Sequence, residues 1–139
     1  MYVMIFTDTI TIYSYYKDNG VEKWHRAVLK GVMWKRKRVQ SVNTDGKLNI
    51  VDTVSITIPY RALYLPYKEF LLSSDRLSHW TIETASNLSV AVLGECDKEI
   101  GDSYRLKDLK RDYSDVVTLK SLADNTNRDH LKNWKVIGA

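Results

Sequence analysis

Three histidines and one cysteine are the side chains of this sequence best suited to metal or nucleophilic chemistry. The histidines, His25, His79 and His130, are far apart, and no pair has the short spacing that places two imidazoles on one face of an element. The single Cys96 excludes an intramolecular disulfide and a cysteine-based zinc site, because each needs at least two thiols. We therefore expect no metal and no cofactor, and interpret the histidines as surface or hydrogen-bonded residues.

Cys96 is also a poor candidate nucleophile. It lies between Glu95 and Asp97, whose carboxylates disfavour a reactive thiolate, so we interpret it as a small residue at the end of a strand. The sequence has no Gly-x-Ser-x-Gly elbow, no glycine-rich phosphate loop and no Ser-x-x-Lys accompanied by its supporting motifs. The carboxylate pair Glu95 and Asp97 does not indicate acid–base catalysis either, because such pairs are common in turns and catalysis also needs a cleft. The sequence predicts a protein that is not an enzyme.

The densest charge is a run of basic residues directly after Trp34, which comprises Lys35, Arg36, Lys37 and Arg38. In an extended strand, alternation sends the two lysines to one face and the two arginines to the other, and a buried strand accepts neither pair. We therefore expect a projecting loop near 35–51, which also contains Lys47. Its basic side chains either contact DNA or an acidic partner surface, or they form the solvated face of a hairpin arm.

Alternating β-branched and aromatic residues predict the elements that position this loop. The clearest pattern is at 52–59, where every second residue is Val or Ile, which indicates a strand with one buried face. One surface helix is predicted at 103–112, with Ser103 as its cap. Residues 40–51 are polar and are interpreted as a long hairpin tip or flexible loop. Strands are predicted at 8–16, 21–29, 32–39, 52–59, 80–82, 88–92, 115–122 and 132–137.

Aromatic residues mark the expected core. Residues 60–78 have no clean period, and we interpret them as a packed, irregular lid on the core rather than a partner patch. The residues predicted to anchor the core are Trp24, Trp34, Trp80 and Trp134. Together these patterns predict a mainly β fold, an antiparallel β-barrel or sandwich of about seven to eight strands with one short helix.

Composition sets the class of protein. A chain of 139 residues with 44% hydrophobic residues suits a single domain over 1–139, and a net charge of +4 gives only weak attraction to polyanions. No stretch approaches the roughly 18 apolar residues of a membrane span, so no membrane partner is expected. The apolar residues 1–6 have no basic flank and no cleavage site, so we do not interpret them as a secretion signal and expect a protein that is cytosolic when synthesised.

The order of the segments carries a family resemblance. In sequence these are DTITIYSYYKDNG from Asp8, W-x-R-x-x-L-x-G-V-x-W from Trp24, DTVSITIP, WTI, V-x-G-E-x-D-x-E-I from Val92, DVVTL, ADN and WKVIG. This frame resembles a family of small proteins encoded in the structural modules of tailed phages and prophages of Gram-positive bacteria. In broad layout it is also similar to phage minor capsid and head-closure (stopper) proteins, which are small β-barrels that assemble as rings below the portal.

The resemblance implies a structural role without catalysis. It implies a head–tail connector or head-closure subunit in a homo-oligomeric ring, about six-fold, that joins portal or adaptor proteins to the tail and retains DNA. The expected location is the virion, and the bacterial host cytoplasm during assembly. In that setting the projecting loop faces a neighbour or the packaged DNA. The alternatives are a nucleic-acid-binding β-barrel module and a tail or minor capsid component.

Overall fold

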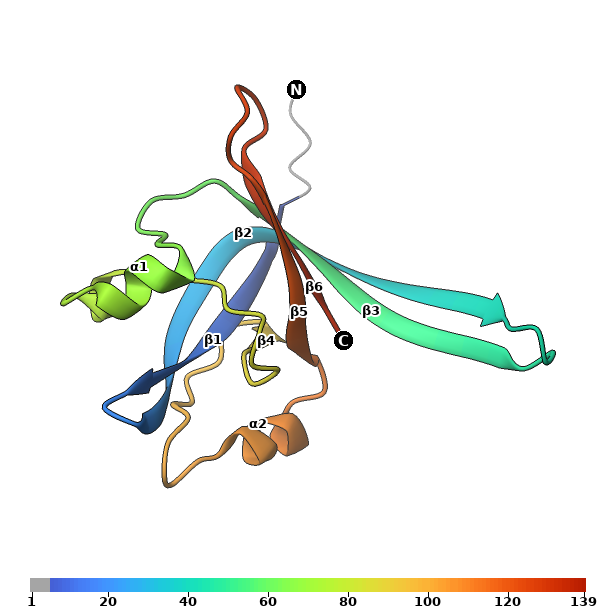
Figure 1. Cartoon of the computed structure of the whole chain (residues 1–139), viewed down its shortest axis with the longest axis horizontal. Coiled ribbons are helices and arrows are strands. Elements are labelled where there is room, and N and C mark those ends of the chain that lie inside the picture. The colour runs from blue at the N-terminus through green and yellow to red at the C-terminus, as the bar shows by residue number, and fades with distance from the viewer. Residues whose placement is uncertain (1–5) are drawn as a thin grey trace.

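A computed structural model describes residues 6–139, so residues 1–5 of the apolar opening lie outside the described part. In chain order the elements are β1 (Asp8–Asp18), β2 (Val21–Val42), β3 (Leu48–Pro59), α1 (Tyr67–Leu72), the 3-10 helix η1 (Arg76–Ser78), β4 (Val90–Leu93), α2 (Leu106–Asp112), β5 (Val116–Asn125) and β6 (Asn133–Gly138). Neighbouring strands are antiparallel in the order β1-β2-β3-β6-β5-β4, and β4 pairs with β1 to close the sheet in a ring (Figure 1). The predicted mainly β, antiparallel fold is confirmed.

Two long strands each run through both halves of the ring. β2 pairs with β1 through Val32 and with β3 from Met33, and the change follows Gly31, whose φ of +75° is a conformation that glycine adopts without strain. β5 pairs with β4 up to Thr118 and with β6 from Leu119 onward, across a register irregularity. Strands that switch sheets in this way make the corners of a closed sheet. Among the described residues, the closed ring is thus made of six strands, of which β2 and β5 serve both halves.

The ring encloses the main hydrophobic core. Val54, Ile56 and Ile58 of β3 point into it, as their alternation predicted, and each is at most 1% exposed. Trp80 and Trp134 meet at its centre with their ring centroids 5.1 Å apart in an edge-to-face arrangement. This core forms the rigid body from which the other features project.

A second hydrophobic cluster lies on the outer face of the half of the sheet that contains β1. Tyr13, Val92 and Leu109 belong to it, and the chain between β4 and the end of α2 covers it. As a result, both faces of β1 are covered, and every residue at 10–15 is buried. The sequence predicted a strand at 8–16, and the cover on its second face comes from residues far away in the chain.

In three places the structure corrects or narrows the predicted elements. Residues 40–51 form a hairpin tip rather than a flexible loop, because β2 continues to Val42, β3 begins at Leu48, and only the residues between them form the turn. The predicted strand at 80–82 is an irregular segment with one isolated parallel bridge between Tyr64 and Trp80. In both segments, the spacing of apolar residues does not show which backbone groups form hydrogen bonds with a neighbouring strand.

The third difference is the start of the helix. It was predicted to begin at Ser103, but α2 begins at Leu106, and the cap position is occupied by Arg105. The carboxylate of Asp108 accepts a hydrogen bond from the backbone N–H of Arg105 at 2.9 Å and so satisfies the free amide from within the helix. Among the described residues, no helix is long and apolar enough to cross a membrane.

The segment between β3 and β4 closes one end of the ring. Phe70 of α1 is fully buried and contacts the rings of Tyr16 and His25, with centroids 5.6 and 5.3 Å away. Two leucines of the same segment, Leu72 and Leu77, are 87% and 89% exposed. The segment therefore acts as a lid through Phe70, in agreement with the prediction for 60–78, and presents apolar side chains on its outer side.

Candidate interaction site

The most unusual surface of the molecule is a two-stranded hairpin, residues 35–52, which we call the arm (Figure 1). β6 pairs with β3 from Val54 to Pro59, so in the part of the chain that the structure describes the outer parts of β2 and β3 pair only with each other. All side chains described at 35–52 are exposed. Nothing among the described residues covers either face of the arm.

A tight turn holds the end of the arm. The Asn43 Oδ1 accepts hydrogen bonds from the backbone N–H groups of Asp45 and Lys47 at 3.2 and 2.9 Å. Gly46 has a φ of +77°, and Asn43 and Lys47 are also joined by a backbone hydrogen bond of 3.0 Å. Asp45 and Gly46, a residue pair typical of tight turns, lie within the turn, and the arm is an ordered hairpin rather than a loose loop.

The basic residues of the arm fall into two groups. Arg36 makes an ion pair with Asp115 at 3.3 Å, and Arg38 makes one with Asp52 across the hairpin at 3.1 Å. Both pairs are exposed, so each contributes little to stability. The other three basic residues make no ion pair within residues 6–139, and these are Lys35, Lys37 and Lys47. The unbroken strand register places the first two on the face opposite the arginines, as predicted.

The tip of the arm carries apolar side chains that the sequence reasoning missed. Val42 and Leu48 are paired across the hairpin and are 68% and 57% exposed, and Ile50 is 48% exposed. All three lie on the arginine face, which continues the inward-facing register of β3. The signal was present, because Leu48 and Ile50 extend the alternation of 54–58 toward the turn, but the surrounding polar residues concealed it.

A groove is the second feature that sequence reasoning missed. It has a volume of about 440 Å³ and lies between the start of β2 and the start of α2. The half-buried indole of Trp24 forms one wall, and its Nε1 donates a hydrogen bond of 2.9 Å to the carbonyl of Leu88. The groove is lined by Val21, Glu22, Trp24, Leu88, Ile100, Gly101, Asp102, Arg105, Leu106 and Lys107.

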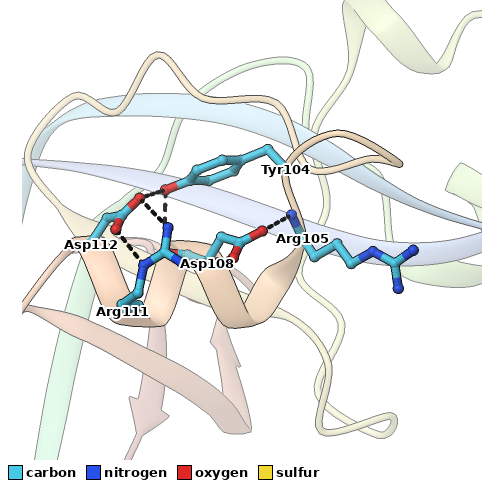
Figure 2. A network of polar contacts seen from close by, with 5 residues as sticks. All are labelled: Tyr104, Arg105, Asp108, Arg111 and Asp112. Atoms are coloured by element: carbon cyan, nitrogen blue, oxygen red, sulfur yellow. Dashed lines mark hydrogen bonds and ion pairs between the residues drawn. The ribbon is translucent and has the colours of Figure 1, made fainter.

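A polar network fixes the helix that forms the other wall of the groove. Figure 2 shows Tyr104 and Arg111 converging on Asp112, with distances of 2.8 Å from the Tyr104 hydroxyl and 2.8 Å from the Arg111 Nε to the carboxylate. These hydrogen bonds lower the pKa of Asp112 below its ordinary value. Arg111 also lies 3.2 Å from Asp108, which closes the start of the helix. The network lies within residues 104–112 and stabilises the helix itself, while Leu109 packs it against the second hydrophobic cluster.

The four tryptophans occupy two kinds of position. Trp80 and Trp134 are 5% and 2% exposed and lie in the main core. Trp34 is half-buried and packs against that core at the root of the arm, and Trp24 packs against the second cluster at the groove. The structure thus places two predicted anchors inside the ring and two at the edges of the exposed features.

The histidines and the cysteine are not brought together. His25 is buried against Phe70, and burial lowers its pKa below the ordinary value. His79 lies 2.8 Å from the Asp75 carbonyl, and His130 is exposed. Cys96 is buried after β4. Within the described residues, no group of three or more His, Cys, Asp or Glu side chains is placed to hold a metal ion.

The chain is a small antiparallel β protein in which the sheet closes in a ring and extends a two-stranded arm. A model described as a family of unknown function (DUF6751) matches residues 5–139, so the chain belongs to this family. No curated protein and no solved structure matches the chain.

Proposed function

We propose that the chain is a structural subunit of a tailed-phage virion, a head–tail connector or head-closure protein without catalytic activity. In this proposal about six copies form a ring between the portal or adaptor and the tail and help to retain packaged DNA. The protein then resides in the virion, and in the bacterial host cytoplasm during assembly. The similarity of the segment order to phage connector and closure proteins supports this role.

The observation that carries the proposal is the apolar tip of the bare arm. In an isolated copy, Val42, Leu48 and Ile50 are exposed to water, and no third strand from residues 6–139 supports the hairpin. A β-ribbon of this kind becomes favourable when a second molecule covers it. A rigid ring-closed body with one extended arm is a suitable shape for a part that links copies of itself, and a tail or minor capsid component would use the arm in the same way.

The first test is the assembly state of a chain with a shortened arm. Deleting the four cross-strand pairs 37–40 and 50–53 keeps the turn and preserves the inward and outward alternation on both strands. We expect the full-length chain to form rings of about six copies by native mass spectrometry and negative-stain microscopy, and the shortened chain to stay monomeric with an unchanged circular dichroism spectrum. A full-length chain that is monomeric at every concentration contradicts the proposal.

The second test is genetic. In the phage or prophage that encodes the chain, we expect portal and tail genes on either side of its gene. Deleting the gene should give particles that lose DNA or lack tails. Normal infectious particles from the deletion strain would rule out a connector or closure role.

A second candidate function is a nucleic-acid-binding β-barrel module, and the free lysines of the arm are the observation that favours it. Lys35 and Lys37 project from one face, and Lys47 lies beside the turn. If these three side chains neutralise phosphates, the binding constant for double-stranded DNA should fall with salt with a logarithmic slope of about −2.7. Replacing all three lysines by serine should abolish this dependence. Unchanged DNA retention in assembled particles after the same replacement would exclude a DNA-facing arm.

A further inference from the structure

We propose that the tip of the arm of one copy docks into the groove beside Trp24 of a second copy, next to an acidic segment at 94–102. The inference rests on the function proposed above, because it identifies the two surfaces through which copies of the chain join. One surface is the convex tip of a rigid hairpin, and the other is a concave groove on the body.

The groove has the size and the walls to receive the tip. Its volume of about 440 Å³ lies in the range of about 300–1,000 Å³ that is usual for ligand pockets. Trp24 and Leu106 give it apolar walls, and Val21, which is 56% exposed, adds an apolar rim. Trp24 is held by its hydrogen bond to Leu88, so the wall is formed before a partner arrives.

The charges of the two surfaces are complementary. Residues 35–52 contain five basic and two acidic side chains, hence a net charge of +3, whereas 94–102 contain four acidic and one basic, hence −3. Three residues of the second segment, Ile100 to Asp102, line the groove; Asp102 and Glu22 are balanced there by Arg105 and Lys107, so the negative charge lies in the part of the segment beside the groove. Such opposed patches steer association and fix the orientation of two surfaces.

The carboxylates of this segment are available to a partner. They are all exposed, and none makes an ion pair within residues 6–139: Glu95, Asp97, Glu99 and Asp102. Lys35, Lys37 and Lys47 of the arm are likewise exposed and make no ion pair within residues 6–139. Counting Asp45 in the arm and Lys98 in the acidic segment, which also make no ion pair within these residues, the unpaired charges of the two surfaces remain opposite in net sign.

The arm cannot reach the groove of its own chain. It extends from the body on the side opposite the turn that precedes Val21 and the chain that leads into α2 (Figure 1). Within the arm, β2 extends for about 23 Å from Lys35 to Val42, at about 3.3 Å per residue. A contact between the tip and the groove thus joins two copies head to tail, and a repeated contact of this kind closes into a ring when the rotation between copies allows it.

A cross-linking experiment tests the contact directly. The double variant Val21→Cys and Leu48→Cys places one thiol at the rim of the groove and one at the tip, while the native Cys96 stays buried. Treatment with a short bismaleimide should give a ladder of covalent oligomers, with at least about fivefold more linked dimer than the control, because docking raises the effective concentration of the two thiols.

The matched control is the double variant Leu48→Cys and Leu131→Cys. Leu131 is 84% exposed and lies outside the groove, and labelling with a fluorescent maleimide verifies that all engineered thiols react. Assembled rings in which the Val21 and Leu48 positions cross-link no better than this control overturn the inference and leave the proposed function intact. A chain that stays monomeric overturns both.

Charge reversal gives an independent readout. Reversing Lys35, Lys37 and Lys47 to glutamate should weaken assembly, and so should reversing Glu95, Asp97 and Glu99 to lysine. Mixing the two reversed chains should restore association between them, as measured by analytical ultracentrifugation. Failure of the mixture to associate, with both variants folded, contradicts the pairing of these two surfaces.

Discussion

The two parts of β2 share one backbone and have opposite surroundings. From Val21 to Val32 the strand pairs with β1, in the half of the sheet whose outer face is covered by the chain around α2. From Lys35 to Val42 it pairs only with β3, and its described side chains are exposed. The protein thus uses a long covering segment for one half of the strand and leaves the other half bare.

The comparison of the two parts of β2 indicates that the exposed apolar residues of the arm form an interaction surface. Single exposed apolar side chains are normal on protein surfaces, but three of them gathered at the tip of an unsupported ribbon are not. The covered half shows how this fold shields apolar sheet surface within one chain. No described residue covers the arm in this way, which is consistent with a cover supplied by another molecule.

The largest contrast is expected when one leucine is removed from each region. Leu109→Ala, which removes a fully buried side chain of α2 from the second cluster, should lower the free energy of unfolding by about 2–5 kcal/mol. Leu48→Ala at the tip should change it by no more than about 0.5 kcal/mol in the monomer. Urea denaturation followed by tryptophan fluorescence measures both. Equal losses would show that the tip is packed within its own chain.

A smaller effect is expected at the point where the two parts of β2 meet. Gly31→Ala introduces a side chain at a φ of +75°, which should cost about 1–2 kcal/mol of unfolding free energy. Gly101→Ala is the matched control, because nothing lies within 4 Å of the added carbon, and it should be near neutral. Thermal unfolding of both variants measures the difference. A neutral Gly31→Ala would show that the corner does not depend on this conformation.

Acid should act on the covered part of β2 through His25. Because burial lowers the pKa of His25 in the folded chain, the unfolded chain binds more protons once the pH falls below about 6.5. Stability should therefore be full above that pH and decline as the pH falls through the folded-state pKa. His25→Gln should flatten this decline in urea titrations between pH 7 and 5, whereas the exposed His130→Gln should leave it unchanged. Identical profiles for both variants would remove His25 from the explanation.

The smallest effect is expected for the ion pair that bridges the arm. Arg38 and Asp52 are 3.1 Å apart with side chains 61% and 44% exposed, so Asp52→Asn should cost at most about 0.5 kcal/mol. The loss should shrink further at high salt, which screens exposed charges. Denaturation at low and high salt checks both statements, and a large, salt-independent loss would mean that the arm is supported by this pair.

Local alternation made the inner strands predictable. Val54, Ile56 and Ile58 point into the core as their pattern indicated. The basic run of the arm is exposed, as expected, because charged side chains on both faces of a strand are too costly to bury. The surroundings of β1 were not predictable in this way. Tyr13 is buried by Cys96 and Leu109, which are far away in sequence, so the second covered face depends on tertiary packing.

The candidate site was predictable only in part. The sequence located the arm, because a basic run followed by a turn signal has few alternatives. It did not reveal the apolar tip, because Leu48 and Ile50 lie among polar residues, nor the groove, because Trp24 and Leu106 meet only in the folded chain. Trp24 was expected in the core because sequence alone does not distinguish a core tryptophan from one that lines a groove.

The length of β2 has a consequence for the geometry of an assembly. The strand begins at Val21, on the rim of the groove, and ends at Val42, at the tip of the arm. One continuous strand therefore connects the two surfaces proposed to join neighbouring copies. At about 3.3 Å per residue, this strand sets an upper limit of about 70 Å on the distance between the two sites. In an assembly of this kind, the number of residues in β2 and the bend at Gly31 determine the distance between successive copies. That distance in turn limits how many copies complete the ring.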